Sequence, residues 1–143
     1  MTINQLSIFV ENKAGTVAQI TKSIAKAGVS IRALSVADTQ EFGILRLIVD
    51  NVEKAKEALN ESECVVSVTK VIGVEIPDVA GGLSSVLDHM SKNNINVEYL
   101  YAFITISGKH AYVVLRVEDN EKAIKVLLDN GVKLVTESDI ASL

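Results

Sequence analysis

Two short segments of this chain hold the residue types that could bind a small carboxylate. They are residues 11–17, which read ENKAGTV, and residues 77–83, which read PDVAGGL. In each segment a glycine, Gly15 or Gly81, stands just before a helical pattern begins. A helix N-terminus carries unpaired backbone N–H groups and about half a positive charge, and a glycine lets a ligand approach that backbone closely. Each segment therefore predicts a place where a carboxylate can be held.

Both segments also offer an acceptor for an ammonium group. Asn12 and Asp78 lie shortly before the two glycines. Asp78 should hold an ammonium more strongly than Asn12, because both partners of its hydrogen bond are then charged. A helix N-terminus contributes only about 0.3–2 kcal/mol, so further contacts must supply the rest of the affinity. The alternative is that both residues are ordinary turn or helix-cap residues.

The two segments are corresponding parts of an internal repeat. Gly15 corresponds to Gly81 at an offset of 66 residues, and Leu47 corresponds to Leu115 at an offset of 68 residues. The change of offset indicates a small length difference in the hairpin between them. A period of this size is too long for a solenoid unit. It predicts two copies of one small module, residues 1–69 and 70–143, with any site present twice or built between the copies.

Both copies show the same order of local patterns. Residues 5–10 alternate apolar and polar side chains like a half-buried strand, and after Gly15 the apolar residues recur at helical spacing. In the first copy, further elements are expected over residues 29–36 (strand), 44–49 (strand), 52–60 (helix, capped by Asp50 or Asn51) and 65–68 (strand). In the second copy they are expected over residues 71–76 (strand), 83–90 (helix), 97–106 and 112–117 (two strands of a hairpin around residues 107–109) and 132–135 (strand). A second helix, capped by Asn120, is expected before the last of these strands. The tail, residues 137–143, is expected to be a short cap or frayed.

The order strand–helix–strand–strand–helix–strand predicts an α+β fold of the ferredoxin-like βαββαβ type. Each module should have a four-stranded antiparallel sheet with both helices on one face. The junction at residues 69–72 contains neither Gly nor Pro. We therefore expect the two sheets to be packed side by side rather than joined by a flexible linker.

Composition excludes several classes of function. The chain of 143 residues is 48% hydrophobic and 22% charged, with a net charge of −4, which argues against a nucleic-acid or anionic membrane surface. No apolar run approaches the roughly 18 residues of a transmembrane helix, and no signal peptide is expected. The chain has one cysteine and so forms no intramolecular disulfide, which fits the reducing cytoplasm.

The opening of each copy resembles the ACT domain, a small ferredoxin-like module that senses amino acids. The family pattern is a strand, a turn of the type Asn/Asp-x-Pro-Gly, a small or polar residue and Leu, and then the first helix. Here Ala14 and Ala80 replace the proline, and Val17 replaces the leucine. A later stretch of the pattern is matched by GVSI at residues 28–31 and NINV at residues 94–97. The resemblance covers about residues 3–136 and implies a free-standing tandem ACT protein without a catalytic domain.

The resemblance also implies where a ligand would lie. In the family, modules pair edge to edge, and the ligand sits between the turn of one module and the second strand of its neighbour. In this chain the resemblance implies that residues 12–17 face residues 100–103 and that residues 78–83 face residues 34–37. The two sites should bind the ligand with unequal affinities, because Tyr99 and Tyr101 give only one of the two strands aromatic side chains. The expected ligand-binding residues are Asn12, Ala14, Gly15, Thr16, Val17, Leu34, Ser35, Val36, Asp78, Ala80, Gly81, Gly82, Leu83, Leu100, Tyr101 and Ala102.

Residues with catalytic or metal-binding potential are few and scattered. His89 is expected on the solvated face of a helix, His110 in an exposed loop, and Cys64 as a small, partly buried hydrophobic residue. Two separated histidines and one cysteine form no metal cluster, and no base is indicated that could activate the thiol. We therefore expect no catalytic residues, no metal and no cofactor.

The sequence favours a non-catalytic regulatory protein that binds a free amino acid at the interfaces between its two modules. The alternative is a ligand-free docking module that regulates a partner enzyme through its sheet face and edges. A homodimer is expected, because the cores are small and the sheet edges exposed. Neither nucleic acid nor membrane is expected as a partner.

Overall fold

The computed structural model describes residues 1–105 and 108–143. The chain divides into two compact units. The first unit comprises Asn4–Thr69 with Ile140–Leu143, and the second comprises Met1–Ile3 with Lys70–Asp139. None of the helices within the described residues has the length and apolar character needed to cross a membrane.

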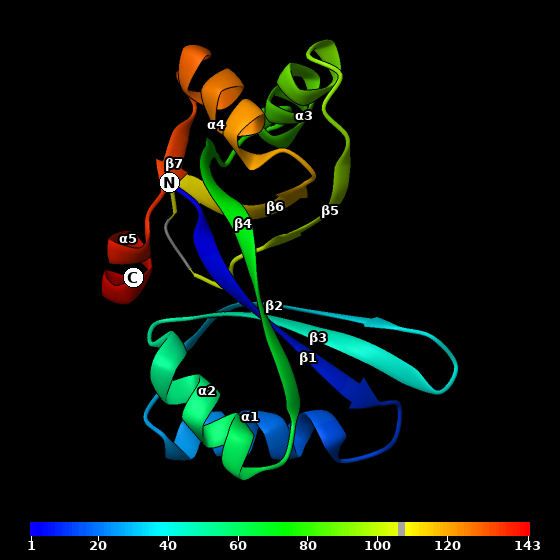
Figure 1. Ribbon diagram of the computed structural model, residues 1–143. Coiled ribbons are helices and arrows are strands. Elements are labelled where there is room, and N and C mark those ends of the chain that lie inside the picture. Colours follow the sequence, from blue (N-terminus) through cyan, green and yellow to red (C-terminus); the bar gives the residue numbers. More distant parts are fainter. Residues whose placement is uncertain (106–107) are drawn as a thin grey trace. The chain divides into compact units, whose positions relative to one another are not determined.

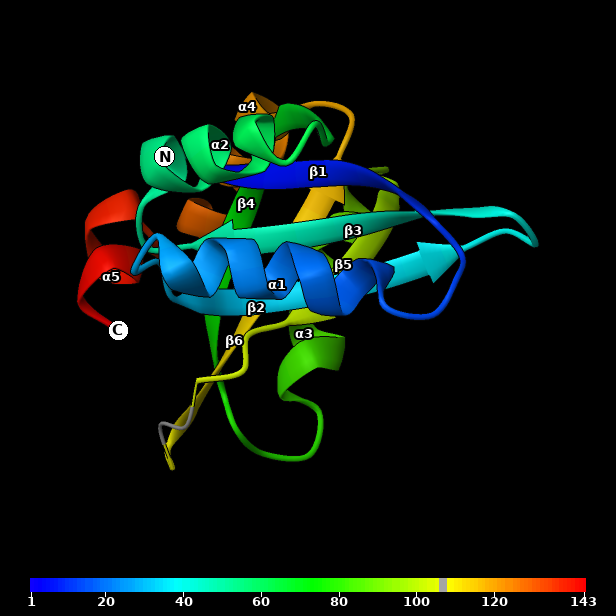
Figure 2. The ribbon, with the colours of Figure 1, turned by 90° about the horizontal axis from the view of Figure 1, so that it is seen from below.

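The first unit has the βαββαβ order that the sequence predicts. Its elements are β1 (Ile3–Glu11), α1 (Thr16–Lys26), β2 (Ile31–Asp38), β3 (Phe42–Val49), α2 (Val52–Glu61) and the start of β4 (Val65–Pro77). The strands lie in the order β2-β3-β1-β4, with β1 and β2 each antiparallel to β3. Helices α1 and α2 lie side by side on one face of this sheet (Figures 1 and 2).

Alternation along β1 builds the core of this unit. Leu6 and Ile8 are completely buried and pack with Ile24 of α1, whereas Phe9 on the opposite face is 54% exposed. Gln5 departs from the expected pattern because it is completely buried, and its Nε2 donates to Ser7 Oγ at 3.0 Å. A buried amide needs such partners, since an unpaired one is costly.

The second unit repeats the arrangement. It contains the rest of β4, α3 (Gly82–Lys92), β5 (Val97–Ala102), β6 (His110–Val117), α4 (Asn120–Asp129), β7 (Lys133–Val135) and the first residues of α5 (Glu137–Ser142), in the strand order β5-β6-β4-β7. The strands predicted at residues 65–68 and 71–76 are one continuous strand, β4, of 13 residues. It follows that the last strand of the first βαββαβ unit is also the first strand of the second.

Three local predictions need correction or completion. Strand β5 ends at Ala102, after which the N–H of Phe103 donates to the Tyr112 carbonyl at 2.9 Å. Residues 103–105 were predicted as part of this strand but lie outside β5. The predicted strand end at Ile106 and the turn residue Ser107 lie outside the described residues. The tail is a short helix, α5, and its start is fixed by reciprocal hydrogen bonds between Thr136 and Asp139.

The predicted cap of α4 was one residue late. Asp119, not Asn120, is the N-cap, and its Oδ1 accepts from the N–H of Lys122 at 3.1 Å. The corresponding cap of α2 is Asn51, one of the two residues that the sequence allowed, and it accepts from the N–H of Lys54. Asn120 instead donates its Nδ2 to the Lys70 carbonyl at 3.3 Å.

The cap gives a first prediction. Asp119→Ala should lower the free energy of unfolding by about 1 kcal/mol, because one N–H of the first turn of α4 loses its acceptor. Asp119→Asn retains an acceptor oxygen and should keep most of the stability. Urea denaturation of both variants tests this, and equal losses would contradict the role assigned to the side-chain oxygen.

Candidate functional site

Both predicted turns place a left-handed glycine at the start of a helix. Gly15 is the N-cap of α1 with φ 87° and ψ −14°, and Gly81 is the N-cap of α3 with φ 86° and ψ −3°. A residue with a Cβ atom is strained in this conformation, so the backbone itself requires glycine here. A glycine also provides no capping side chain, and neither helix has a side-chain cap among the described residues. The N–H of Thr16 donates to the Lys13 carbonyl and that of Gly82 to the Val79 carbonyl. The next two N–H groups of each first helical turn are left for water or a ligand.

The two predicted ammonium acceptors are both accessible. Asn12 donates its Nδ2 to the carbonyls of Thr39 and Gln40, each at 3.4 Å, so its Oδ1 is the free end of the amide. Asp78 is exposed, and its backbone N–H donates to the Lys109 carbonyl at 3.2 Å. Its carboxylate has no hydrogen bond or ion pair within the described residues. Their use by a ligand stays a prediction.

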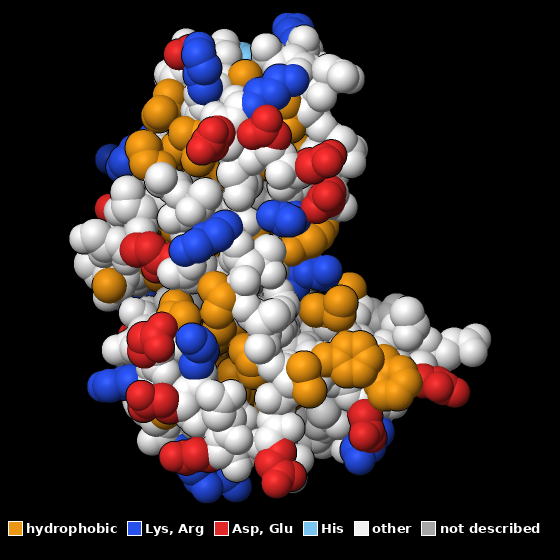
Figure 3. All heavy atoms as spheres, in the orientation of Figure 1, with side chains coloured by type: hydrophobic (Ala, Val, Ile, Leu, Met, Phe, Trp, Pro, Cys, Tyr) orange, Lys and Arg blue, Asp and Glu red, His pale blue; other side chains and the backbone are white. Residues whose placement is uncertain are grey.

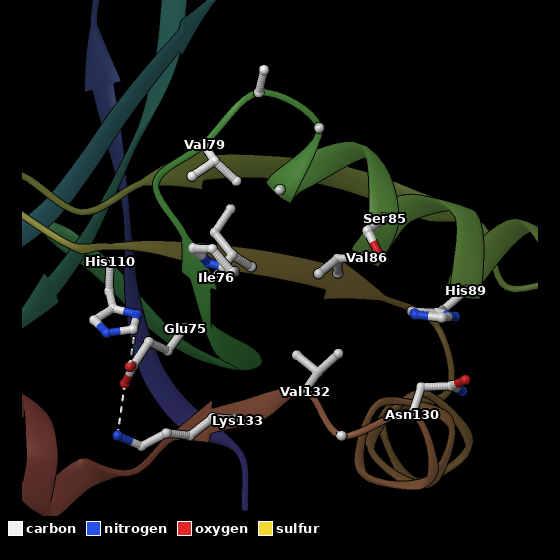
Figure 4. Close-up of a pocket in the computed structure, with 15 residues that line it drawn as sticks. Glu75, Ile76, Val79, Ser85, Val86, His89, His110, Asn130, Val132 and Lys133 are labelled. Carbon is white, nitrogen blue, oxygen red and sulfur yellow. Dashed lines mark ion pairs between the residues drawn. The ribbon is translucent and has the colours of Figure 1, made fainter.

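A groove of about 490 Å³ lies beside Gly81 within the second unit (Figure 4). We call it the second-unit groove. Its walls are the end of β4, the turn and first half of α3, the start of β6 and the loop from α4 into β7. Of the predicted site residues, it brings together Ala80, Gly81 and Gly82, whereas Asp78 and Leu83 do not line it.

A matching groove of about 400 Å³, the first-unit groove, lies beside the start of α1. Its lining residues are Phe9, Val10, Glu11, Lys13, Thr16, Gln19, Ile20, Phe42, Ser62, Glu63, Cys64 and Val65. Each of them corresponds, through the internal repeat, to a residue that lines the second-unit groove. The groove is therefore a product of the duplicated fold and not an accident of one module.

The side chains at one end of the two grooves differ in character. In the second unit, Glu75 accepts from Lys133 Nζ at 2.8 Å and pairs with His110 Nδ1 at 3.2 Å. The hydrogen bond to this carboxylate, together with its charge, raises the pKa of Lys133. The corresponding positions in the first unit are Phe9, Phe42 and Val65, and the two phenylalanine rings stack with their centroids 5.1 Å apart.

Sequence reasoning missed this ionic cluster. His110 is exposed as expected, but it is the first residue of β6 and not a loop residue, and its Nδ1 lies 3.2 Å from Glu75 Oε1. The three residues of the cluster come from three strands, so nothing in the local sequence brings them together. The signal that was available is the repeat, in which three apolar positions of one copy all become ionisable in the other.

The start of α1 has an unused hydroxyl. Thr16 Oγ1 is buried and has no hydrogen-bond partner among the described residues. Thr16 lines the first-unit groove, where it stands at the position of Gly82 in the second unit. A buried donor without a partner costs free energy, so a ligand that accepts its hydrogen bond would recover some of that cost.

Cys64 also lines the first-unit groove, and it packs against the core as a partly buried residue. Burial raises the pKa of its thiol, so the unreactive protonated form dominates at neutral pH. Among the described residues, no three His, Cys, Asp or Glu side chains gather in a way that could hold a metal ion.

Of the other predicted site residues, Ala14 precedes Gly15 in the first turn, and Val17 lies in α1 and packs against the core of the first unit. The last six lie on the outer strands of the two sheets. Leu34, Ser35 and Val36 are on β2, and Leu100, Tyr101 and Ala102 are on β5. None of the six lines either groove. Leu34, Val36 and Leu100 are exposed, but Tyr101 is only 8% exposed and stacks on Tyr99. That each turn faces the second strand of the other module stays a prediction.

Comparison with known proteins gives a consistent family assignment. A family model described as "ACT domain pair" matches residues 1–143. The solved structure of protein BT0572 from Bacteroides thetaiotaomicron is 38% identical, with a TM-score of 0.93 over 100% of this chain and 98% of that one. No protein with a curated description matches.

More distant structures share the fold. The regulatory subunit of aspartate kinase from Thermus thermophilus, in its ligand-free form, is 16% identical with a TM-score of 0.63, over 88% of this chain and 90% of that one. The regulatory subunit of aspartate kinase from Thermus flavus is 13% identical with a TM-score of 0.60, over the same shares of the two chains.

The two turns should tolerate substitution differently after the capping glycine. A Cβ atom on Gly82 would collide with the Pro77 carbonyl oxygen, so we expect Gly82→Ala to cost about 1–3 kcal/mol of stability. Thr16→Ala keeps its Cβ and removes a hydroxyl that has no partner, so its effect should be small. Urea denaturation compares the two, and equal destabilisation would contradict the difference between the turns.

Alkylation of Cys64 should report its raised pKa. We expect its rate with iodoacetamide to keep rising with pH beyond the point where N-acetylcysteine levels off, because burial disfavours the thiolate. Rates measured across a pH series test this. A plateau at lower pH than that of the free thiol would show an activated cysteine instead.

Proposed function

Because the chain belongs to the ACT domain family as a domain pair, we propose that it is a non-catalytic regulatory protein that binds a small amino acid at its two turns. The observation that carries the proposal is the duplicated left-handed glycine at the start of α1 and α3. It leaves a helix N-terminus uncapped in each unit, with an accessible acceptor, Asn12 or Asp78, shortly before it.

The proposed contacts use both charged groups of the ligand. The α-carboxylate accepts from the backbone N–H groups at the first turn of α1 or α3, where the helix dipole favours negative charge. The α-ammonium donates to Asn12 Oδ1 in the first unit and to the Asp78 carboxylate in the second. In the first unit the carboxylate also accepts from Thr16 Oγ1, which has no other partner.

The two sites should bind with unequal affinity. Asp78 adds a charge-assisted hydrogen bond that Asn12 cannot match. Thr16, on the other hand, offers a hydroxyl that Gly82 lacks. As proposed from the family, the ligand side chain would be held by the second strand of a neighbouring module, through Leu34–Val36 or Leu100–Ala102.

Regulation would follow from differential binding. A ligand shifts an assembly or a conformation only by the difference between its affinities for the two states. We propose that the amino acid favours one arrangement of a homodimer, and that a partner enzyme in the cytoplasm responds to that arrangement.

One observation favours the alternative, a docking module. Phe9, Phe42 and Ile44 of the first unit are 54%, 41% and 37% exposed, and Figure 3 shows hydrophobic side chains gathered over the end of β1 and the neighbouring part of β3. Exposed apolar clusters of this kind often mark an interaction surface. This surface and an amino-acid site could serve the same regulatory protein.

Thermal unfolding in the presence of each of the twenty amino acids, at millimolar concentration, tests the proposal. A ligand that binds only the folded state raises the melting temperature by mass action. A rise with one or a few related amino acids is expected. If none raises it, the amino-acid proposal fails and docking through the apolar surface becomes the leading function.

Calorimetry with the amino acid found in this way then tests the residues. Asp78→Ala should weaken one site by about tenfold or more, because a hydrogen bond between two charged groups is lost, and Asn12→Ala should weaken the other site less. Glu118→Ala removes an exposed carboxylate outside both turns and serves as the control. Wild-type binding by both turn variants would refute the proposed contacts.

A further inference from the structure

We propose that the second-unit groove is a binding site for a small organic anion, a carboxylate on a short branched aliphatic body, and that the first-unit groove is not. The inference does not rest on the amino-acid function proposed above. Asp78 does not line the groove, and the proposed ligand needs no ammonium group. The argument rests on the groove's ionic cluster, on its apolar floor and on the comparison with the first unit.

The ionic cluster presents its nitrogen-bearing side chains outward. The Glu75 side chain is only 13% exposed, whereas those of His110 and Lys133 are 47% and 70% exposed. Both carboxylate oxygens of Glu75 are engaged, one by each neighbour. The buried acid therefore positions the other two side chains, and a ligand arriving from solvent meets the ammonium and the imidazole first. Such donors suit a carboxylate.

The middle of the groove is apolar. Ile76 and Val86 are 5% and 3% exposed, and they form the floor together with Val132. Figure 4 shows these side chains between the ionic cluster at one end and His89 with Asn130 at the other. A volume of about 490 Å³ is in the range of small-molecule sites, which combine apolar walls with a few polar groups.

The charges around the groove favour an anion. Glu75 is the acid among the lining residues, and it is paired. Asp139 is near enough to influence the pKa of Lys133, but its carboxylate accepts two hydrogen bonds from Thr136. The start of α3, with its uncapped N–H groups, adds partial positive charge on the same wall.

The first-unit groove is a natural control. It has the same walls, but Phe9, Phe42 and Val65 replace the ionic cluster. Its lining includes two acids, Glu11 and Glu63, against one cation, Lys13, which is itself paired with Glu11 at 3.1 Å. An anion should therefore find no unpaired lysine at that end of the first-unit groove, although the two grooves share their shape.

Titration of ¹⁵N-labelled protein with isovalerate at pH 7, followed by amide chemical shifts, tests the proposal. We expect shifts at Gly81, Gly82 and Lys133 that saturate, and none at their repeat partners Gly15, Thr16 and Val65. Isovaleramide, which has the same shape without the charge, should bind at least about tenfold more weakly. Isoamylamine, a cation of similar shape, should not bind in the groove.

A variant at the exposed cation tests the sign of the ligand charge. Lys133→Met should weaken isovalerate binding by about tenfold or more, because the ammonium that pairs with the carboxylate is lost. Lys122→Met, on an exposed lysine of α4 outside the groove, is the matched control.

Three outcomes would overturn the proposal. They are binding of the amine, unchanged binding in Lys133→Met, and shifts that map to the first-unit groove instead. Inorganic phosphate tests the apolar floor separately. If phosphate binds as tightly as isovalerate, the aliphatic body contributes nothing and that part of the proposal fails.

Discussion

The left-handed backbone at Gly15 and Gly81 is the constraint on which the functional architecture depends. The chain leaves a strand there and enters a helix within a few residues, at a φ of 87° or 86°. An L-residue would be strained, by about 1–2 kcal/mol. Because the residue that makes the turn possible has no side chain, the turn cannot cap its own helix. The left-handed glycine that sets the direction of the helix therefore also leaves N–H groups of its first turn without a side-chain cap, beside a groove.

Much of this could be predicted from sequence because it depends on local patterns. Alternation in β1 indicated which face is buried, and the glycine turns that precede the helical patterns were readable at Gly15 and Gly81, whose φ angles are 87° and 86°. Where the local signal was degenerate, prediction was poorer. Asp119 and Asn120 are adjacent and both are good caps, and only the path of the chain decides that Asp119 takes the role.

The ionic cluster could not be predicted, because it depends on strand register. Glu75 lies opposite Lys133 in the β4–β7 pairing, and His110 lies opposite Pro77 in the β4–β6 pairing. A slip of one residue in either pairing would turn one partner to the other face of the sheet. Local sequence does not encode such a pairing between residues 33 or more positions apart. The Phe9–Phe42 stack escaped notice for the same reason, since it depends on the register of β1 against β3.

The repeat separates what the fold requires from what it permits. Positions that build the core or the turn agree between the copies: Ile8 and Val74 are both completely buried, and Gly15 and Gly81 share one conformation. The positions of Phe9, Phe42 and Val65 carry no such requirement, because they are partly or largely exposed at the mouth of a groove. Their counterparts could become Glu75, His110 and Lys133 without disturbing either core. A duplicated fold can in this way keep two grooves of one shape while giving them different charges, and therefore different ligands.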